Sequence, residues 1–336
     1  MRKENFILLA HGGGGRLTKE LVEKLFLPHF SNPLLSRLED SAVLEFPHLK
    51  LAFTTDSYTV DPIFFPGGDI GKLAVFGTVN DLSMMGATPL YISSAFILEE
   101  GFPMEQLEKI IHSMEEACKR AEVIMVTGDT KVVGKGMADK IYITTAGIGI
   151  IPNNLSLSLK YVQPGDLVII NGPIGEHGIA IMLEREGISL RGDIKSDTAP
   201  LNEIVKEILK VGGIKAMRDL TRGGLGGILC EIAEATNLSI HIEEEAIPIK
   251  KEVLSACEIL GLDPLYVANE GKFIAIVSPA SAEEILTIMR KRDDGKDAQI
   301  IGKIERKPKG KVVLRTTIGG SRIVEMPIGE ELPRIC

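Results

Sequence analysis

The chain has 336 residues, enough for two domains of ordinary size, each with its own core. Its formal net charge is −8 and it has no basic run, so we expect neither nucleic acid nor an anionic membrane as a partner. No stretch approaches the ~18 apolar residues of a membrane span, and the apolar residues 6–10 are too few for a signal peptide. The four cysteines show no CxxC spacing, which predicts a cytoplasmic protein with reduced thiols.

Residues 1–40 are predicted to form an N-terminal arm that carries a glycine run, Gly12, Gly13, Gly14 and Gly15. A helix is expected directly after it, over Leu17–Leu27. Glycine amides that converge at a helix start can bind a phosphate group. The run is not a Walker A loop, because no Gly-Lys-Ser/Thr follows at the required spacing. A flexible hinge is the alternative interpretation.

An N-terminal domain is expected over residues 41–154. Its longest helix is expected to begin after Asp69, whose carboxylate can cap the first turn. A second helix has the apolar spacing of an amphipathic helix. The elements expected here are strands Ala42–Phe46, Leu49–Thr55, Leu90–Leu98, Val123–Val126 (short and buried) and Asp139–Ile151, and helices Ile70–Met85 and Met104–Ala121.

Three aspartates of this domain form a candidate metal site. Asp56 and Asp129 each follow the end of a predicted strand, and Asp81 interrupts an otherwise apolar helix. Carboxylates brought from separate elements to one sheet edge suit Mg²⁺, a hard cation that prefers oxygen ligands. Each aspartate could instead be a turn former or a surface residue.

A second domain is expected over residues 155–316, where strands again alternate with helices. This alternation predicts an α+β protein built of α/β layers in both halves. Arg222 next to the glycines at 223–227 offers a second anion site, and close helix packing is the alternative. The elements expected here are strands Leu167–Ile170, Leu238–Glu243, Leu265–Val277 (interrupted at 269–272), Gln299–Ile304 and Val312–Thr316, and helices Gly178–Arg185, Leu201–Val211, Ile228–Ala235, Glu252–Leu260 and Ala282–Arg290.

Residues 317–336 are predicted to be a flexible tail, because their apolar residues follow no helical period. The tail ends at Cys336, an exposed nucleophile that most domains do not place at a terminus. The 16 residues after Gly320, if fully extended, reach roughly 50 Å at ~3.3 Å per residue. The tail could therefore visit a pocket and a partner protein in turn. A frayed end with a chance cysteine is the alternative.

Several strings together resemble a known family, the HypE hydrogenase maturation proteins. This family lies within a broader one that includes aminoimidazole ribonucleotide synthetase and selenophosphate synthetase. The resemblance spans the whole chain. The internal strings indicate ATP use, and the ending Pro333-Arg334-Ile335-Cys336 is typical of HypE. The internal strings are Gly68–Val75, Gly77–Leu82, Thr127–Val133, Asp219–Gly224 and Asn269–Lys272.

The resemblance implies a two-domain, aminoimidazole ribonucleotide synthetase-like fold in which the N-terminal sheets of two subunits pair into a barrel. ATP would bind near that dimer interface. It also implies a reaction at the terminal thiol. The carbamoyltransferase HypF would place a carboxamide on the sulfur, and ATP would drive its dehydration to a thiocyanate. The cyano group would then pass to iron held by a HypC–HypD complex, for a [NiFe]-hydrogenase.

The residue roles implied by the resemblance fall into three groups. Cys336 would be the carrier, and Lys131 and Glu270 would orient the amide and remove its proton. The expected ligands of Mg²⁺ are Asp56, Asp81 and Asp129. The residues expected at ATP are Gly12, Gly13, Gly14, Gly15, Lys72, Asn80, Thr127, Gly128 and Arg222.

Two rival functions remain open at this point. One is an ATP-dependent synthetase or kinase that acts on a free small molecule, as the broader relatives do. The other is a non-enzymatic carrier that only presents its thiol to partners. The acidic residues favour an enzyme over a carrier, and the terminal cysteine disfavours a free substrate.

Overall fold

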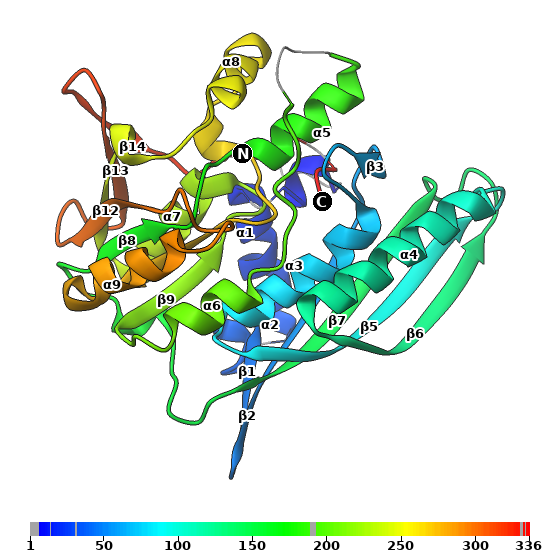
Figure 1. Cartoon of the computed structure of the whole chain (residues 1–336), viewed down its shortest axis with the longest axis horizontal. Helices are drawn as coiled ribbons and strands as arrows, with labels where there is room; N and C mark the ends of the chain where they lie inside the picture. The colour runs from blue at the N-terminus through cyan, green and yellow to red at the C-terminus, as the bar shows by residue number, and fades with distance from the viewer. Residues whose placement is uncertain (1–6, 14, 31, 189–192, 330–331, 333) are drawn as a thin grey trace.

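The computed structural model describes residues 7–13, 15–30, 32–188, 193–329, 332 and 334–336. Gly14, one of the glycines expected at phosphate, lies outside these residues. Two domains pack together, one on a five-stranded sheet and the other on a seven-stranded sheet (Figure 1). The predicted α+β class is therefore confirmed. Within the described part of the chain, no helix is long and apolar enough to span a membrane.

The N-terminal sheet has the strand order β1-β2-β7-β5-β6. Neighbouring strands are antiparallel, except that β5 and β6 run parallel. Helices α3 (Ile70–Met84) and α4 (Met104–Ala121) lie along one face of this sheet (Figure 1). A small hairpin, β3 (Phe64–Phe65) with β4 (Gly68–Asp69), precedes α3. The sheet strands are β1 (Ala42–Phe46), β2 (Leu49–Tyr58), β5 (Thr88–Glu99), β6 (Ile124–Val133) and β7 (Ile141–Ile151).

Helix α3 lies between the two domains, which explains its composition. It is apolar on all sides, as expected for a helix that has neighbours all round. On one side it contacts β2 and β7, and on the other it contacts β9 (Ile214–Asp219) and α6 (Asn202–Ile208). The expected cap is present, since Asp69 Oδ1 accepts bonds from the backbone N–H groups of Gly71 (2.8 Å) and Lys72 (3.2 Å).

The C-terminal sheet has the order β14-β13-β10-β12-β8-β11-β9 and carries helices on both faces. Successive side chains of β8 and β11 point to opposite faces. Ile170 and Ile274 join the core beneath α7, whereas Ile169 and Ala275 join the core beneath α6 and α9. The other elements are β8 (Leu167–Ile170), β10 (Ser239–Glu243), β11 (Phe273–Val277), β12 (Gln299–Glu305), β13 (Lys311–Arg315), β14 (Ser321–Val324), α5 (Glu176–Glu186), α7 (Gly224–Thr236), α8 (Lys251–Leu260) and α9 (Pro279–Arg290).

The expected arm contains helices α1 (Arg16–Leu21) and α2 (Leu27–Phe30), joined by a π-helical turn at Val22–Phe26. Together they form one helical segment that runs three residues beyond the predicted Leu27. The glycine run precedes α1 and packs against the C-terminal segment of the chain. The N–H of Arg16 donates to the carbonyl of Pro327 (2.9 Å). A Cβ atom at Gly15 would lie 2.5 Å from that same carbonyl oxygen, so only glycine fits there.

Strand β6 differs most from its prediction. It was expected to be short, buried and finished at Val126, but it continues to Val133 and is exposed over nearly its whole length. Among the described strands it is an edge strand of its sheet and pairs with β5 alone. An edge strand has solvent beside it, so the polar residues 127–131 do not end it. Asp129 therefore lies within a strand, and Asp56 likewise lies within β2 rather than after it.

Three further segments differ from their predictions. Strand β9 was not predicted, although all but one of its residues are buried. Helix α7 begins at Gly224, inside the glycine run rather than after it. The predicted flexible tail contains the regular strand β14, which pairs with β13 through the register Val312 to Val324. In the last case the pairing comes from a partner strand already in place, which no local pattern reveals.

Candidate functional site

A group of carboxylates gathers where the two domains meet, and we call it the interdomain acidic cluster. Asp56 comes from β2 and Asp81 from α3 in the N-terminal domain. Asp219 ends β9, and Glu270 lies in the turn before β11. Asp40 precedes β1. The cluster is largely removed from solvent, with Asp219 and Glu270 fully buried.

Burial and mutual repulsion act together on these carboxyl groups. Burial raises the pKa of Asp81 well above its ordinary value, and the charges of Asp219, Asp56 and Asp40 raise it further. The pKa of Asp219 rises well above its ordinary value for the same reasons, first burial and then Asp40 and Asp56. Such a cluster favours a bound cation or bound protons.

Two arginines supply positive charge beside the cluster. The Nη1 of Arg218 lies 3.1 Å from Oδ2 of Asp40, and both side chains are largely buried. Arg222 follows β9 and donates from Nη1 to the carbonyl of Gly12 (2.8 Å). Its charge lowers the pKa of Asp56, although burial dominates and the net shift is upward. Arg222 therefore links the glycine run to the acidic cluster.

Glu270 is held by its backbone while its carboxyl group is only partly engaged. Its N–H donates to Oδ1 of Asp197 (3.0 Å), and its carbonyl accepts from Nδ2 of Asn80 (3.3 Å). Its Oε1 atom is buried and has no hydrogen-bond partner among the residues that the structure describes. Burial raises the pKa of Glu270 well above its ordinary value, with further contributions from Asp219, Asp197 and Asp56. A buried carboxyl group with a raised pKa and an unused oxygen is typical of an acid–base site.

Asp129 and Lys131 lie on β6, away from the interdomain acidic cluster. Nζ of Lys131 contacts both carboxylate oxygens of Asp129, at 2.9 and 2.7 Å, on the exposed strand β6. This lowers the pKa of Asp129, chiefly through the hydrogen bond from Lys131. Strands β7 and β5 separate β6 from β2, so Asp129 is roughly 14 Å from Asp56 at ~4.8 Å per strand. Within the described residues, no three acidic, histidine or cysteine side chains have a metal-binding arrangement.

The other residues expected at ATP are spread over three places. Lys72 is in the first turn of α3, nine residues before Asp81, which is roughly 14 Å along the helix axis. The side chain of Asn80 is hydrogen-bonded to the backbone of the second domain. Its Nδ2 donates to the carbonyl of Ala199 (3.1 Å), and its Oδ1 accepts from the N–H of Leu201 (2.8 Å). Thr127 and Gly128 lie on β6 with Lys131.

The end of the tail is docked against both domains, near β3 and α5 (Figure 1). The N–H of Thr59 donates to the carbonyl of Cys336 (2.9 Å), and that of Asp61 donates to the carbonyl of Arg334 (3.1 Å). From the second domain, Nη2 of Arg185 donates to the same Arg334 carbonyl (2.9 Å). The tail therefore bridges the end of β2 and helix α5.

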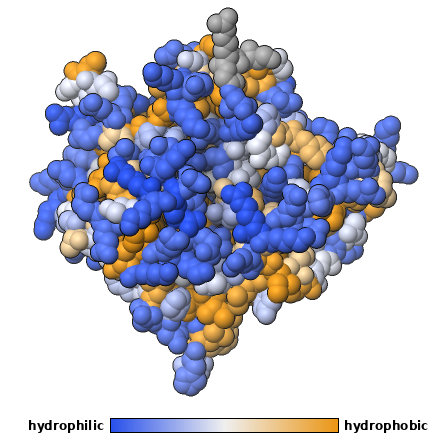
Figure 2. All heavy atoms as spheres, in the orientation of Figure 1, coloured by the Kyte–Doolittle hydropathy of each residue, from blue (hydrophilic) through white to orange (hydrophobic). Residues whose placement is uncertain are grey.

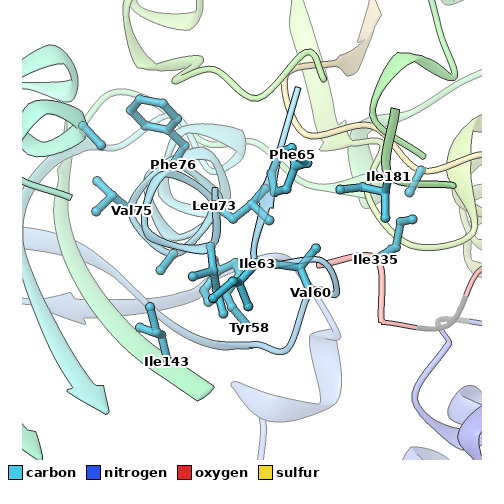
Figure 3. Close-up of a cluster of buried hydrophobic side chains, with 14 of the residues drawn as sticks. Tyr58, Val60, Ile63, Phe65, Leu73, Val75, Phe76, Ile143, Ile181 and Ile335 are labelled. Atoms are coloured by element: carbon cyan, nitrogen blue, oxygen red, sulfur yellow. The ribbon is translucent and has the colours of Figure 1, made fainter. Parts of the chain in front are cut away.

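Side chains of the tail add to this docking. Ile335 is almost fully buried beside Val60 and Ile181, as Figure 3 shows. The guanidinium of Arg334 pairs with Asp139 and donates from Nε to the carbonyl of Thr59 (2.9 Å). Cys336 itself is partly exposed. A small pocket of about 20 Å³ lies beside the docked tail, lined by Gly13, Arg222, Leu332 and Ile335 among others.

Sequence analysis did not identify several residues that make up this site. Asp219 and Asp40 are part of the acidic cluster, but the strand that positions Asp219 was not predicted. His177, Arg185 and Asp197 hold the tail or Glu270, and each lies far from its contact along the chain. For Asp219 a signal existed, because it begins the Asp-Leu-Thr-Arg-Gly-Gly string that already indicated ATP use.

Comparison with known proteins accounts for both domains. Residues 38–151 match the N-terminal domain of AIR synthase related proteins, and residues 163–315 match the C-terminal domain. The carbamoyl dehydratase HypE of Rhodobacter capsulatus is 47% identical over 99% of this chain and 99% of its own length. A solved HypE–HypF complex is 49% identical, with a TM-score of 0.87, covering 91% of this chain and 99% of that one.

A second solved structure, HypE in complex with ATP, is 47% identical with a TM-score of 0.83. The match covers 98% of this chain and 100% of that chain. Similarity of this extent, in sequence and in both domains, goes beyond a shared fold. The chain belongs to the HypE family of carbamoyl dehydratases, hydrogenase maturation enzymes built from the two AIR synthase related domains.

Proposed function

We propose that this enzyme uses ATP to dehydrate a carboxamide on its own Cys336, giving a protein-bound thiocyanate that supplies cyanide for a [NiFe]-hydrogenase. The observation that carries the proposal is the docking of the tail at the interdomain site. The backbone carbonyl of Cys336 accepts a hydrogen bond from the N–H of Thr59. Thr59 lies three residues beyond Asp56, roughly 10 Å along the chain. The tail also lines a pocket with Arg222 and Gly13.

The chemistry fits this setting. A carboxamide oxygen is a poor leaving group, so the γ-phosphoryl group of ATP is transferred to it, releasing ADP. The nitrogen loses one proton as the C=N bond of the imidate phosphate forms. Loss of its second proton expels phosphate and leaves S–C≡N. Transfer of this kind depends on positioning and on charge stabilisation more than on covalent help from the protein.

We propose Glu270 as the group that accepts a nitrogen proton. Its Oε1 has no partner among the described residues, and its raised pKa makes its carboxylate a stronger base. A general base works best when its pKa lies near the operating pH. Arg222 beside the glycine run offers positive charge to phosphate oxygens.

We propose that a magnesium ion binds at the interdomain acidic cluster together with ATP, whose phosphates would complete a ligand set that the described residues do not form on their own. Burial raises the pKa values of Asp56, Asp81 and Asp219, and neighbouring carboxylates raise those of Asp81 and Asp219 further. A bound divalent ion would stabilise the ionised forms of all three. These three aspartates would hold the ion, and it would neutralise charge on the ATP phosphates. Asp219 takes the place that the sequence prediction assigned to Asp129. We infer that Asp129 and Lys131 serve the site from a second copy of the chain.

The exposed face of the N-terminal sheet supports such a dimer. A row of apolar side chains crosses it, with Phe53 opposite Ile148, Ile148 opposite Tyr91, and Tyr91 opposite Ile124. Their side chains are 41%, 38%, 47% and 61% exposed respectively. Apolar residues also gather along the lower margin of the molecule in Figure 2. A second copy that pairs its sheet here would bury this row and cover the open edge at β6.

A charge at the centre of this row should break the dimer. We expect Ile148→Lys to shift the protein to a monomer, because burying an unpaired ammonium group costs several kcal/mol. Size-exclusion chromatography with light scattering measures the mass directly. Ile259→Lys is the matched control, since Ile259 is 64% exposed on α8 of the other domain. A dimer that survives Ile148→Lys would contradict sheet pairing.

The partners follow from the same chemistry. The solved HypE–HypF complex supports HypF as the protein that carbamoylates Cys336. An iron-carrying HypC–HypD complex is proposed to accept the cyano group. Both exchanges require the tail to leave its docked position, so we propose that it moves between docked and released states. A cytoplasmic location fits this partner set.

Intact-protein mass spectrometry tests the function. The carbamoylated protein should lose the mass of one water after addition of ATP and Mg²⁺, and peptide mapping should place the change on Cys336. If the carbamoyl adduct persists while ATP is consumed, the tail is not the substrate, and a synthetase for a free small molecule becomes the better explanation. If neither changes, a non-enzymatic thiol carrier is favoured.

A further inference from the structure

His177 on α5 is fully buried, and both of its ring nitrogens have hydrogen-bond partners. Nε2 lies 2.8 Å from the carbonyl oxygen of Ile335, the residue before Cys336. Nδ1 lies 2.7 Å from Oγ of Ser196. A carbonyl can only accept, so Nε2 carries the proton, and in the neutral ring Nδ1 accepts from the Ser196 hydroxyl. Burial lowers the pKa of His177, which favours this neutral form.

The ring is also fixed by packing. Phe65 of the β3–β4 hairpin lies edge-on to it, with ring centroids 5.5 Å apart and planes at 82°. An edge-to-face contact of this kind restrains the ring beyond the area it buries. The N–H of His177 is thereby aimed at one point, the backbone of the tail directly before the nucleophile.

The partner of His177 belongs to a segment that also holds Glu270. We call residues 196–198 the crossing segment, because they run between the hairpin of the first domain and the Glu270 turn of the second. The N–H of Ser196 donates to Pro66 (2.8 Å). The carboxylate of Asp197 accepts from the N–H groups of Glu270 (3.0 Å) and Gly271 (3.2 Å).

Two glycines show how tightly the crossing segment is held. A Cβ atom at Gly271 would lie 2.0 Å from the carbonyl oxygen of Asp197. A Cβ atom at Gly67, which has a φ of +95°, would lie 2.6 Å from the carbonyl oxygen of Ser196. The backbone is in direct contact on both sides, so a shift of the segment moves the hairpin or the Glu270 turn with it.

We propose that His177 is a positioning residue for the C-terminal cysteine, and that through Ser196 and the crossing segment it links docking of the tail to placement of Glu270. The inference rests on the proposed function for its link to dehydration, but the docking contact itself does not. In the docked state His177 holds Ile335, and Asp197 holds the turn that carries Glu270. Release of the tail breaks the hydrogen bond between Nε2 of His177 and the carbonyl of Ile335. This hydrogen bond therefore favours the docked state.

The test compares His177→Phe, which keeps ring packing but removes the donor, with His177→Gln, whose side-chain N–H can still reach the tail carbonyl. The first measurement is the alkylation rate of Cys336 by N-ethylmaleimide, resolved by peptide mapping from the other three cysteines. We expect His177→Phe to raise the alkylation rate roughly tenfold, because the docked tail loses one hydrogen bond. We expect His177→Gln to restore much of the protection, because its side chain can still donate. An unchanged rate in His177→Phe overturns the proposal.

His241→Phe is the matched control. His241 also contacts a backbone carbonyl through Nε2, that of Lys307 at 3.1 Å, but on the surface of the second domain. It should leave Cys336 alkylation unchanged. If His177→Phe does not fold, as judged by circular dichroism, Ser196→Ala replaces it, because removing the hydroxyl leaves Nδ1 without its partner. No acceleration in Ser196→Ala would then overturn the proposal.

A second readout separates positioning from a general structural role. In single turnover of the carbamoylated protein, His177→Phe should lower the dehydration rate at saturating ATP while the KM for ATP stays unchanged. A rise in KM with an unchanged maximal rate contradicts the link to Glu270. Wild-type protein that shows no dehydration defeats the proposed function, and the alkylation experiment still decides the docking contact separately.

Discussion

Replacing Cys336 with alanine is expected to abolish thiocyanate formation completely while leaving ATP binding within about twofold of the wild type. The substitution removes the sulfur that we propose as the carrier of the carboxamide. It keeps the backbone carbonyl that bonds to Thr59, so the tail can still dock. Peptide mapping by mass spectrometry measures the product, and calorimetry measures ATP binding.

Cys118→Ala is the matched control for this experiment. Cys118 is also only partly buried, and it lies on α4, which contributes no residue to the interdomain acidic cluster. Burial raises the pKa of its thiol, which makes it a poor nucleophile. This variant should form the product at the wild-type rate. Loss of ATP binding in Cys336→Ala would show that the carrier and the nucleotide site are not separate.

Replacing Glu270 with glutamine is expected to slow dehydration on the order of 10²–10⁴-fold, the usual contribution of a general base. Glutamine keeps the shape of the side chain and the backbone bonds to Asp197 and Asn80, but it cannot accept a proton from the amide nitrogen. Single-turnover measurement on carbamoylated protein gives the rate of the chemical step. Dehydration at the wild-type rate would show that Glu270 is not the general base.

The same variant should gain stability at neutral and higher pH. The folded-state pKa of Glu270 lies well above its unfolded value, so the folded protein holds this proton more tightly. Stability therefore falls as pH rises from the unfolded pKa, ordinarily near 4.5, towards the folded one. Glu270→Gln should melt at a higher temperature than the wild type at pH 8, with a smaller difference at pH 5.

Thermal melting at the two pH values measures this effect, and Glu252→Gln is its control. Glu252 lies exposed in the first turn of α8, so its replacement should change neither the rate nor the pH dependence of melting. Equal melting temperatures for Glu270→Gln and wild type at pH 8 would show that Glu270 is not destabilised by its surroundings.

Much of the secondary structure could be predicted from local patterns. Helix α4 begins and ends where its apolar spacing predicted, at Met104 and Ala121. Strand β8 likewise matches Leu167–Ile170. In both cases the residues that point to the core follow a clear pattern along the chain. Helix α3 was also correctly located, because Asp69 has a local role as its N-terminal cap.

The errors occurred where a remote neighbour decides the structure. The prediction that β6 ends at Val126 relied on the polar residues after it, but an edge strand tolerates them. Strand β14 exists because β13 offers a free edge for it. The last residues of the tail are hydrogen-bonded to Thr59, Asp61 and Arg185, which are all distant in sequence, so no local pattern could predict this docking.

The sequence by itself determined the α+β class and the family, and it pointed to the terminal cysteine as the carrier that we propose, because these depend on periodicity and on short strings such as Pro-Arg-Ile-Cys. Only the tertiary structure decided which carboxylates meet. It brought Asp219 and Asp40 to Asp56 and Asp81, and it left Asp129 on an edge strand with Lys131. Strand order and domain packing set these distances, and neither is encoded in the local pattern around any one aspartate.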